Sequence, residues 1–223
     1  MPYHIGFMIF PDVQQLDLTG AYEVFSMSDA IKVDLLWKDK QVLPTATGIP
    51  LQATQSFADC PQLDMICIPG GPGANAMMED QVALDFVKSQ AKGAKYVTSV
   101  CSGALVLGAA GLLQGRRATT HWNCLHFLSR LGATPVSERV VRDGNVVTTA
   151  GVSAGIDFAF ELLAEIIGQE EAEIIQLNLE YAPKPPFHSG SVEEARPELL
   201  AKARERFSPA RTKKEELFAR LGL

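Results

Sequence analysis

A β-strand that passes into a helix through a single residue is the feature of this sequence that most constrains its fold. Residues 96–100, Tyr-Val-Thr-Ser-Val, are apolar and β-branched, which is typical of a buried strand. Residues 102–111 are small and mostly apolar, and this composition predicts a closely packed helix. Only Cys101 stands between the two segments, so the chain must turn sharply at that residue.

The turn places Cys101 next to the free N–H groups at the start of the helix. Because these groups and the helix dipole favour a negative charge, we expect a thiol that ionises more readily than that of free cysteine. Ser99 and Gly103 are small enough to let the turn close. The geometry resembles the nucleophile elbow of hydrolases, with sulfur in place of oxygen. A buried structural cysteine is the alternative, and the sequence context favours a reactive Cys101.

The composition indicates one sizeable domain. The 223 residues are 47% hydrophobic, which is enough for a proper core, and the net charge of −6 argues against nucleic acid or an anionic membrane as partner. The four cysteines, at positions 60, 67, 101 and 124, lack the spacing of zinc ligands, so we expect neither a metal site nor a disulfide framework. Apart from Cys101 they are interpreted as structural. No signal peptide or membrane span is evident, and we expect a cytoplasmic protein.

Strand and helix patterns alternate along the chain, which predicts an α/β fold with an open, mostly parallel sheet covered by helices on both faces. Beyond residue 186 the composition becomes charged and mildly amphipathic. We therefore expect a main domain over residues 1–185 and a helical C-terminal extension over 186–223 that packs on the same domain or on a dimer partner. The predicted strands are 3–10, 33–37, 63–68, 96–100, 117–120 and a hairpin at 140–149, with a small hairpin or excursion at 48–57. The predicted helices are 16–27, 75–91, 102–111, 122–131, 152–167 and 170–181.

Ligands of such sheets bind at the carboxyl ends of the strands. Four segments follow these ends, and we expect them to meet at one site although they are far apart in the sequence. They are Asp12–Asp17, Gly70-Gly71, Cys101 and Gly151-Val152.

Asp17 is the carboxylate of residues 13–20 that lies among apolar neighbours. Two interpretations are open: an acid stabilised by the dipole at a helix start, or a carboxyl directed at the thiol of Cys101. In the second case two negative groups would repel each other, so one of them must hold a proton. A protonated Asp17 would then serve as a general acid.

Backbone N–H groups and one hydroxyl are further candidates. Gly70 and Gly71 have no side chain to block an approaching ligand, and with the N–H of Ser102 they suit an oxyanion cradle, a tight turn being the alternative. The Ser102 hydroxyl either contacts substrate or water or caps the helix, and the cap is favoured. His121 is the histidine closest to the predicted site, but nothing demonstrates a Cys–His pair and a structural role is favoured.

Five motifs in this order resemble the class I glutamine amidotransferase-like superfamily over about residues 1–185. Within it, the chain is similar to the branch of the cysteine-dependent isocyanide hydratases. The motifs are Asp17-Leu-Thr-Gly-Ala-Tyr-Glu-Val-Phe25, Ile68-Pro-Gly-Gly71, Val100-Cys-Ser-Gly-Ala104, Thr119-Thr-His-Trp122 and Thr149-Ala-Gly-Val-Ser-Ala-Gly-Ile-Asp157.

The resemblance implies a flavodoxin-like sandwich, a homodimer, and hydration of an isocyanide to an N-substituted formamide without metal or organic cofactor. The nucleophile carries over to Cys101 and the acid to Asp17, with substrate contacts at Gly70, Gly71, Ser102 and Val152. Threonine often follows the cysteine in the family, so Ser102 is a departure.

The chemistry suits these residues. The thiolate of Cys101 adds to the isocyanide carbon, Asp17 delivers a proton, and water then releases the formamide from a thioimidate. Other functions stay open: a glyoxalase or deglycase, a redox sensor, or a ligand-sensing domain such as that of arabinose-type regulators. The extension is too short for the DNA-binding region of those regulators.

Overall fold

The central element of the computed structural model, which describes residues 2–223, is a seven-stranded sheet in the order β10-β11-β7-β6-β1-β2-β5. Neighbouring strands run parallel, except that β10 and β11 form the predicted hairpin around Gly144. The strands are β1 (Tyr3–Met8), β2 (Ile31–Trp37), β5 (Gln55–Ser56), β6 (Met65–Ile68), β7 (Tyr96–Val100), β10 (Val140–Asp143) and β11 (Val146–Thr149). Strands β6 and β11 are buried along their whole length, as expected for strands covered on both faces.

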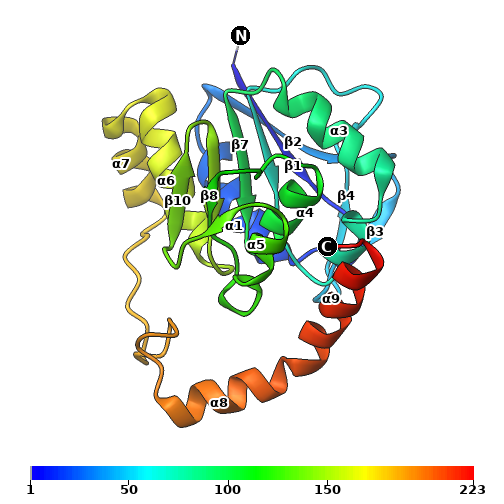
Figure 1. Ribbon diagram of the computed structural model, residues 1–223. Helices are drawn as coiled ribbons and strands as arrows, with labels where there is room; N and C mark the ends of the chain where they lie inside the picture. The colour runs from blue at the N-terminus through cyan, green and yellow to red at the C-terminus, as the bar shows by residue number, and fades with distance from the viewer. Residues whose placement is uncertain (1) are drawn as a thin grey trace.

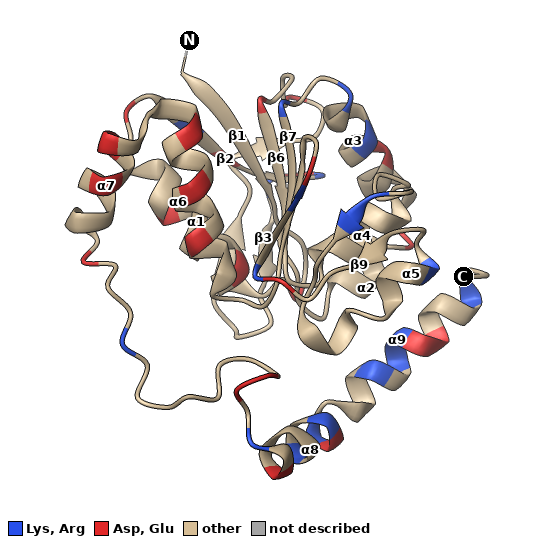
Figure 2. Cartoon of the chain, turned by 60° about the vertical axis from the view of Figure 1, so that its left-hand side comes forward, with Lys and Arg blue, Asp and Glu red and all other residues tan. Residues whose placement is uncertain are grey.

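Helices cover both faces of the sheet (Figures 1 and 2). This arrangement confirms the predicted α/β sandwich with a mostly parallel sheet. One face carries α1 (Gln15–Ser26), α6 (Ala154–Ile167) and α7 (Gln169–Asn178), and the other carries α2 (Ala74–Met77), α3 (Gln81–Ala91), α4 (Gly103–Ala109) and α5 (Phe127–Arg130). Within residues 2–223 no helix has the length and apolar character needed to cross a membrane.

Two predicted helices are interrupted. The segment 75–91 forms α2 and α3, because the Asp80 side chain accepts a hydrogen bond from the Ala83 N–H (3.2 Å) and starts a new helix there. The segment 122–131 begins as a 3₁₀ turn, η1 (Trp122–Cys124), in which the Cys124 N–H donates to the His121 carbonyl (2.7 Å). Only its last residues form the helix α5.

Short strand pairs lie beside the main sheet. An antiparallel pair joins β3 (Val42–Pro44) to β4 (Pro50–Gln52), and a parallel pair joins β8 (Arg117–Ala118) to β9 (Thr134–Pro135). The β8 strand leads the chain toward His121, at the same edge of the sheet as Cys101.

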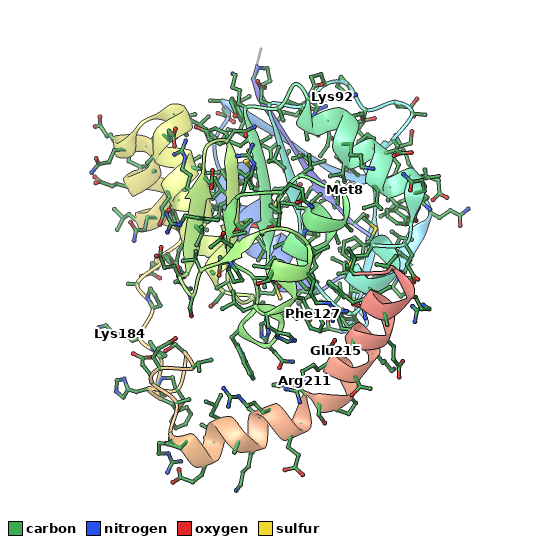
Figure 3. All side chains as sticks on the ribbon, in the orientation of Figure 1. Met8, Lys92, Phe127, Lys184, Arg211 and Glu215 are labelled. Atoms are coloured by element: carbon green, nitrogen blue, oxygen red, sulfur yellow. The ribbon has the colours of Figure 1, made fainter. Side chains whose placement is uncertain are left out.

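The C-terminal extension leaves the body after α7 and returns to it through two helices, α8 (Pro197–Arg206) and α9 (Ser208–Arg220) (Figure 1). Helix α8 buries no residue, whereas α9 buries Lys214, Leu217 and Phe218. The Phe218 ring packs against Phe127 of α5 with ring centroids 4.6 Å apart. The Glu215 carboxylate pairs with Arg130 at 2.5 Å. Figure 3 shows Phe127 of the main domain near Glu215 of α9. Apolar packing of Phe218, the ion pairs of Glu215 with Arg130 and of Arg220 with Glu79, and a hydrogen bond from Lys214 to Asn75 together fix α9 to the main domain.

Candidate active site

Cys101 lies at a strained turn between β7 and α4. Its φ of 55° is in the left-handed region, which is uncommon for a residue other than glycine. Two contacts hold this conformation: the Cys101 N–H donates to the Ala150 carbonyl (2.9 Å), and the Thr120 hydroxyl donates to the Cys101 carbonyl (2.7 Å). At Gly103 a β-carbon would lie 1.9 Å from the Ile68 carbonyl oxygen, so only glycine lets α4 start this close to β6. The sequence-predicted elbow is therefore present.

Asp17 is fully buried in the first turn of α1. Its Oδ2 accepts a hydrogen bond from the Gly70 N–H (2.9 Å), while Oδ1 has no hydrogen-bond partner among the described residues. The carboxyl also interacts with the Cys101 thiol. Of the two interpretations of Asp17, the structure favours the carboxyl directed at the thiol.

The proton affinities of this pair differ from the sequence-based expectation. Burial raises the pKa of Asp17 from 3.8 to about 6, although the Gly70 N–H and the interaction with Cys101 act in the opposite direction. Burial also raises the pKa of Cys101 well above its ordinary value, and the charge of Asp17 adds to this effect. The N–H of Ser102 lowers the pKa of Cys101 but does not outweigh the other causes. The expected acidic thiol is thus wrong for the free site: above pH 6 the thiol keeps its proton and Asp17 is charged.

The Gly70 and Gly71 N–H groups are both engaged within the chain. Gly70 donates to Asp17, and Gly71 donates to the Ser102 hydroxyl oxygen at 3.0 Å. The predicted oxyanion cradle is therefore not open, because one N–H positions the acid and the other positions Ser102. The favoured helix-cap role of Ser102 is wrong as well, since its side chain makes no capping hydrogen bond to α4.

A cavity of about 630 Å³ opens at Cys101. The four segments that follow strand ends meet here as predicted, since Gln14, Gly71, Cys101 and Val152 all line the cavity and Ser102 lies beside them. Asp17 and Gly70 do not line the cavity; they are hydrogen-bonded to each other and buried next to the lining residues. The structure thus brings together all six residues predicted for the site.

His121 and Cys124 also line the cavity. Burial lowers the pKa of His121, with the Lys214 charge acting in the same direction, and its Nδ1 accepts a hydrogen bond from the Asn123 N–H (3.3 Å). Among residues 2–223 no hydrogen bond joins His121 to Cys101, so the geometry offers no Cys–His pair. Cys124, interpreted from the sequence as structural, is buried in the cavity wall.

Sequence reasoning missed the outer wall of the cavity, which the C-terminal extension supplies. Arg206, Phe207, Lys213 and Lys214 line it, and Lys214 is only 7% exposed. One signal was available: Lys214 precedes Leu217 by three residues and Phe218 by four, so all three share one face of a helix. A lysine on the apolar face of a charged helix is a candidate for a buried contact.

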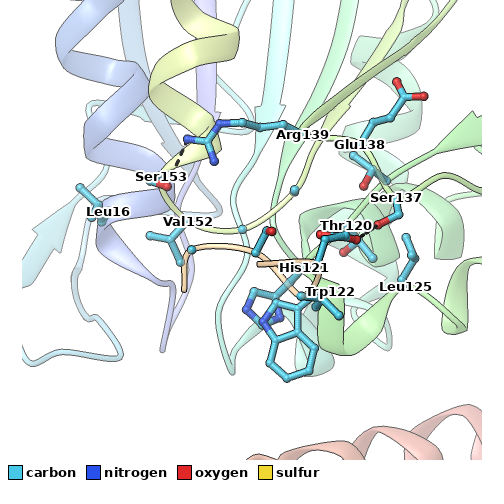
Figure 4. Close-up of a pocket in the computed structure, with 17 residues that line it drawn as sticks. Leu16, Thr120, His121, Trp122, Leu125, Ser137, Glu138, Arg139, Val152 and Ser153 are labelled. Carbon is cyan, nitrogen blue, oxygen red and sulfur yellow. Dashed lines mark hydrogen bonds between the residues drawn. The ribbon is translucent and has the colours of Figure 1, made fainter. Parts of the chain in front are cut away.

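A second cavity, of about 370 Å³, adjoins the first and shares His121 and Val152 with it. Figure 4 shows Arg139 reaching Ser153 at the start of α6, where the Arg139 guanidinium donates to the Ser153 hydroxyl (3.2 Å). His121 and Trp122 stand on the opposite side of this cavity (Figure 4). Val152 therefore lies at the boundary between the two spaces.

Comparison with known proteins gives consistent results. The model of the DJ-1/PfpI family matches residues 4–165. The isonitrile hydratase of Pseudomonas putida is 53% identical over 220 residues, which are 99% of this chain and 96% of that protein. The crystal structure of a ThiJ/PfpI family protein from Pseudomonas syringae superposes with a TM-score of 0.94 at 37% identity, covering 98% of this chain and 91% of that one. Drosophila melanogaster DJ-1beta, at 22% identity and a TM-score of 0.71 over 82% of this chain and all of that one, shares the fold.

Proposed function

The chain belongs to the DJ-1/PfpI family, and from this premise we propose that it is an isocyanide hydratase. The reaction adds water to an isocyanide, also called an isonitrile, and yields an N-substituted formamide. The observation that carries the proposal is the 53% identity to an isonitrile hydratase over nearly the whole of both chains. The buried pair of Cys101 and Asp17 at the cavity supplies the two groups that this chemistry needs.

The first half of the proposed reaction joins the Cys101 sulfur to the isocyanide carbon. As the S–C bond forms, the thiol proton passes to the Asp17 carboxylate, which then delivers it to the same carbon. The product is a thioimidate, R–N=CH–S–Cys101. A carboxyl with a pKa of about 6 suits both transfers, because it accepts and releases a proton near neutral pH.

The second half consumes water. The water oxygen bonds to the thioimidate carbon, and Asp17 takes one water proton and passes it to the nitrogen. The C–S bond then breaks as Asp17 carries the remaining hydroxyl proton to sulfur. The formamide R–NH–CHO leaves, and Cys101 and Asp17 regain their starting protonation. The atoms balance without any redox change, and in this proposal Asp17 carries each proton.

The positions of the remaining site residues support this sequence of steps. Gly70 holds one Asp17 oxygen by its N–H and leaves the other oxygen without a partner, which favours a carboxyl that can take up a proton. A β-carbon at Gly70 would lie 2.6 Å from the Ser102 nitrogen and 2.8 Å from Asp17 Oδ2. We propose that Gly70, Gly71 and Ser102 position the pair, and that Val152 contacts the substrate at the cavity wall.

The test follows formamide production from an aryl isocyanide by ultraviolet absorbance, with Cys101→Ser protein alongside. We expect turnover by the wild type and none by the variant. Absence of turnover in a folded, reduced wild-type protein would contradict the proposal and favour a glyoxalase-like or redox-sensing function.

The proposal extends to assembly, organisation and location. Ile174 and Leu177 leave an apolar face exposed on α7, which supports a homodimer; light scattering that gives the mass of one chain would contradict it.

The division into 1–185 and 186–223 predicts that limited proteolysis cuts first between α7 and α8. The four free cysteines suit a reducing compartment such as the cytoplasm, which cell fractionation tests.

A further inference from the structure

The cavity at Cys101 has a charge opposite to that of the protein as a whole. Three cationic side chains line its outer wall, Arg206, Lys213 and Lys214, and no Asp or Glu does so among the described residues. The whole chain carries a net charge of −6. All three cations come from the C-terminal extension, where Figure 2 shows Lys and Arg along α8 and α9. The extension thus brings positive charge to a site that the main domain leaves without it.

Lys214 is the most informative of the three. Its side chain is 7% exposed, and its ammonium donates a hydrogen bond to the side-chain oxygen of Asn75, which is neutral and lines the same cavity. In residues 2–223 no carboxylate lies within ion-pair distance of Lys214. Burying an ammonium is costly unless it is paired with an opposite charge, and a neutral amide compensates only part of that cost.

No group of the cavity wall supplies the missing negative charge. The titratable neighbours of Lys214 are the thiols of Cys101 and Cys124 and the imidazole of His121. Burial raises the pKa of both thiols and lowers that of His121, so all three are neutral near pH 7. Burial lowers the pKa of Lys214 itself, and a bound anion would reverse this shift. In the part of the chain that the structure describes, no carboxylate lines the cavity, and the Asp17 carboxylate beside Cys101 is not within ion-pair distance of Lys214, so an anionic molecule that enters the cavity can supply the counter-charge.

We infer that the preferred substrate is an isocyanide that carries a carboxylate, which pairs with Lys214 while the isocyano carbon meets Cys101. This inference rests on the proposed hydratase function and names its substrate class. Cys101 follows β7 and Lys214 lies in α9, and both line the same cavity, so one molecule can contact both groups. The cavity of about 630 Å³ is far larger than an isocyano group requires, and it has room for a substrate with two functional groups.

The decisive experiment compares two substrates that differ in charge and hardly in shape, 4-isocyanobenzoate and 4-isocyanobenzamide. For the wild-type protein we expect kcat/KM to be about tenfold higher for the carboxylate, through KM, because a charge-assisted hydrogen bond discriminates by about this factor. Added salt should reduce the preference, since screening weakens the approach of an anion past Arg206 and Lys213. Lys214→Met keeps the length of the side chain and should bring the ratio of the two kcat/KM values close to one.

Matched controls separate the possible results. Lys202→Met removes an exposed lysine of α8 outside the cavity and should leave the ratio unchanged. If Lys214→Met does not fold, two other measurements replace it. These are the effect of salt on the substrate preference of the wild type, and the ratio of the two kcat/KM values in Lys213→Gln. A wild-type ratio of one or less, with both compounds hydrated, overturns the inference and leaves the hydratase function intact. A preference that survives in Lys214→Met and at high salt overturns it as well.

Hydration of neither compound would instead contradict the proposed function. Calorimetry with the products, 4-formamidobenzoate and 4-formamidobenzamide, then still tests the charge preference. Tighter binding of the carboxylate that is lost in Lys214→Met supports the inference, and equal binding of the two products overturns it.

Discussion

The two walls of the Cys101 cavity differ in origin and in packing. The inner wall consists of turns that follow β1, β6, β7 and β11, and its backbone fits so tightly that Gly70 and Gly103 leave no room for a β-carbon. The outer wall is a docked helix, α9, which reaches the body through α8, a helix without a buried residue. Under the proposed function this difference assigns the two walls separate tasks. The inner wall would hold the reacting groups, and the outer wall would select the substrate.

The largest effect is expected at the inner wall. Cys101→Ser should lower hydratase turnover by at least about 10³-fold, because a hydroxyl is a far weaker nucleophile than a thiol at this pH. Turnover measured by formamide absorbance checks this, with Cys60→Ser, a half-buried loop thiol outside the cavity, as the matched control. An active Cys101→Ser protein would mean that the inner wall does not carry the chemistry.

Asp17→Asn should lower turnover by about 10²-fold or more, since the side chain can no longer relay a proton. In the wild type, kcat/KM should fall below pH 6, because a protonated Asp17 cannot accept the thiol proton. A pH profile that is flat between 5 and 8 for the wild type, in a protein that stays folded, would rule out this role.

The same substitution should stabilise the fold. Because burial raises the pKa of Asp17 from 3.8 to about 6, the carboxylate destabilises the native state by about 3 kcal/mol above pH 6. The penalty fades as the pH falls from 6 to 4, where the carboxyl is protonated in the folded protein. Thermal unfolding should therefore show a higher Tm for Asp17→Asn at pH 7.5 and little difference at pH 4. A lower Tm at pH 7.5 would contradict the assigned cost.

Phe218→Ala tests the outer wall. Phe218 is fully buried and packs on Phe127, so its loss should cost about 3 kcal/mol and loosen α9. The preference for a carboxylate-bearing isocyanide should fall several-fold, whereas the Cys101 adduct should still form. Phe187→Ala, at a ring that is 77% exposed, is the control and should change neither property. Loss of adduct formation in folded Phe218→Ala protein would show that the two walls are not separable.

The smallest effect is expected for Ser102. Ser102→Ala leaves the Gly71 N–H without its acceptor, which should cost about 1–3 kcal/mol of stability and lower turnover several-fold. Ser102→Thr keeps the hydroxyl and should restore most of both. Chemical denaturation and steady-state kinetics on the two variants check this, and an Ala variant that equals the wild type would remove Ser102 from the account.

Most of the inner wall could be predicted from the sequence, because local sequence patterns determine the strands and turns that form it. Apolar runs mark the strands, and the parallel sheet brings their carboxyl ends to one edge, so Cys101, Asp17 and Val152 were predicted to meet. The acidity of Cys101 could not be predicted, because it depends on burial beside Asp17, 84 positions earlier in the chain, rather than on the helix that follows. The N–H group at the start of the helix does lower the pKa of Cys101, as predicted, but burial and the Asp17 charge raise it by more.

The outer wall could not be predicted because its contacts are distant in the sequence. Lys214 binds Asn75, which lies 139 positions earlier in the sequence, and the residues around Asn75 show no pattern that predicts this contact. The interruption at Asp80 was also missed, since the apolar spacing of 75–91 suits one helix as well as two. Side-chain hydrogen bonds decide both details: Asp80 accepts from the Ala83 N–H, and Lys214 donates to Asn75.

Mass spectrometry of the protein during turnover tests the central claim most directly, namely that Cys101 attacks the isocyanide carbon and holds the product of that attack. Wild-type protein is mixed with excess 4-isocyanobenzamide, quenched in acid at intervals and digested. The account predicts a mass increase equal to one isocyanide molecule on the peptide that contains Cys101, formed before the formamide and lost once the substrate is consumed. Formamide production with Cys101 unmodified throughout, together with full turnover by Cys101→Ala, would contradict it.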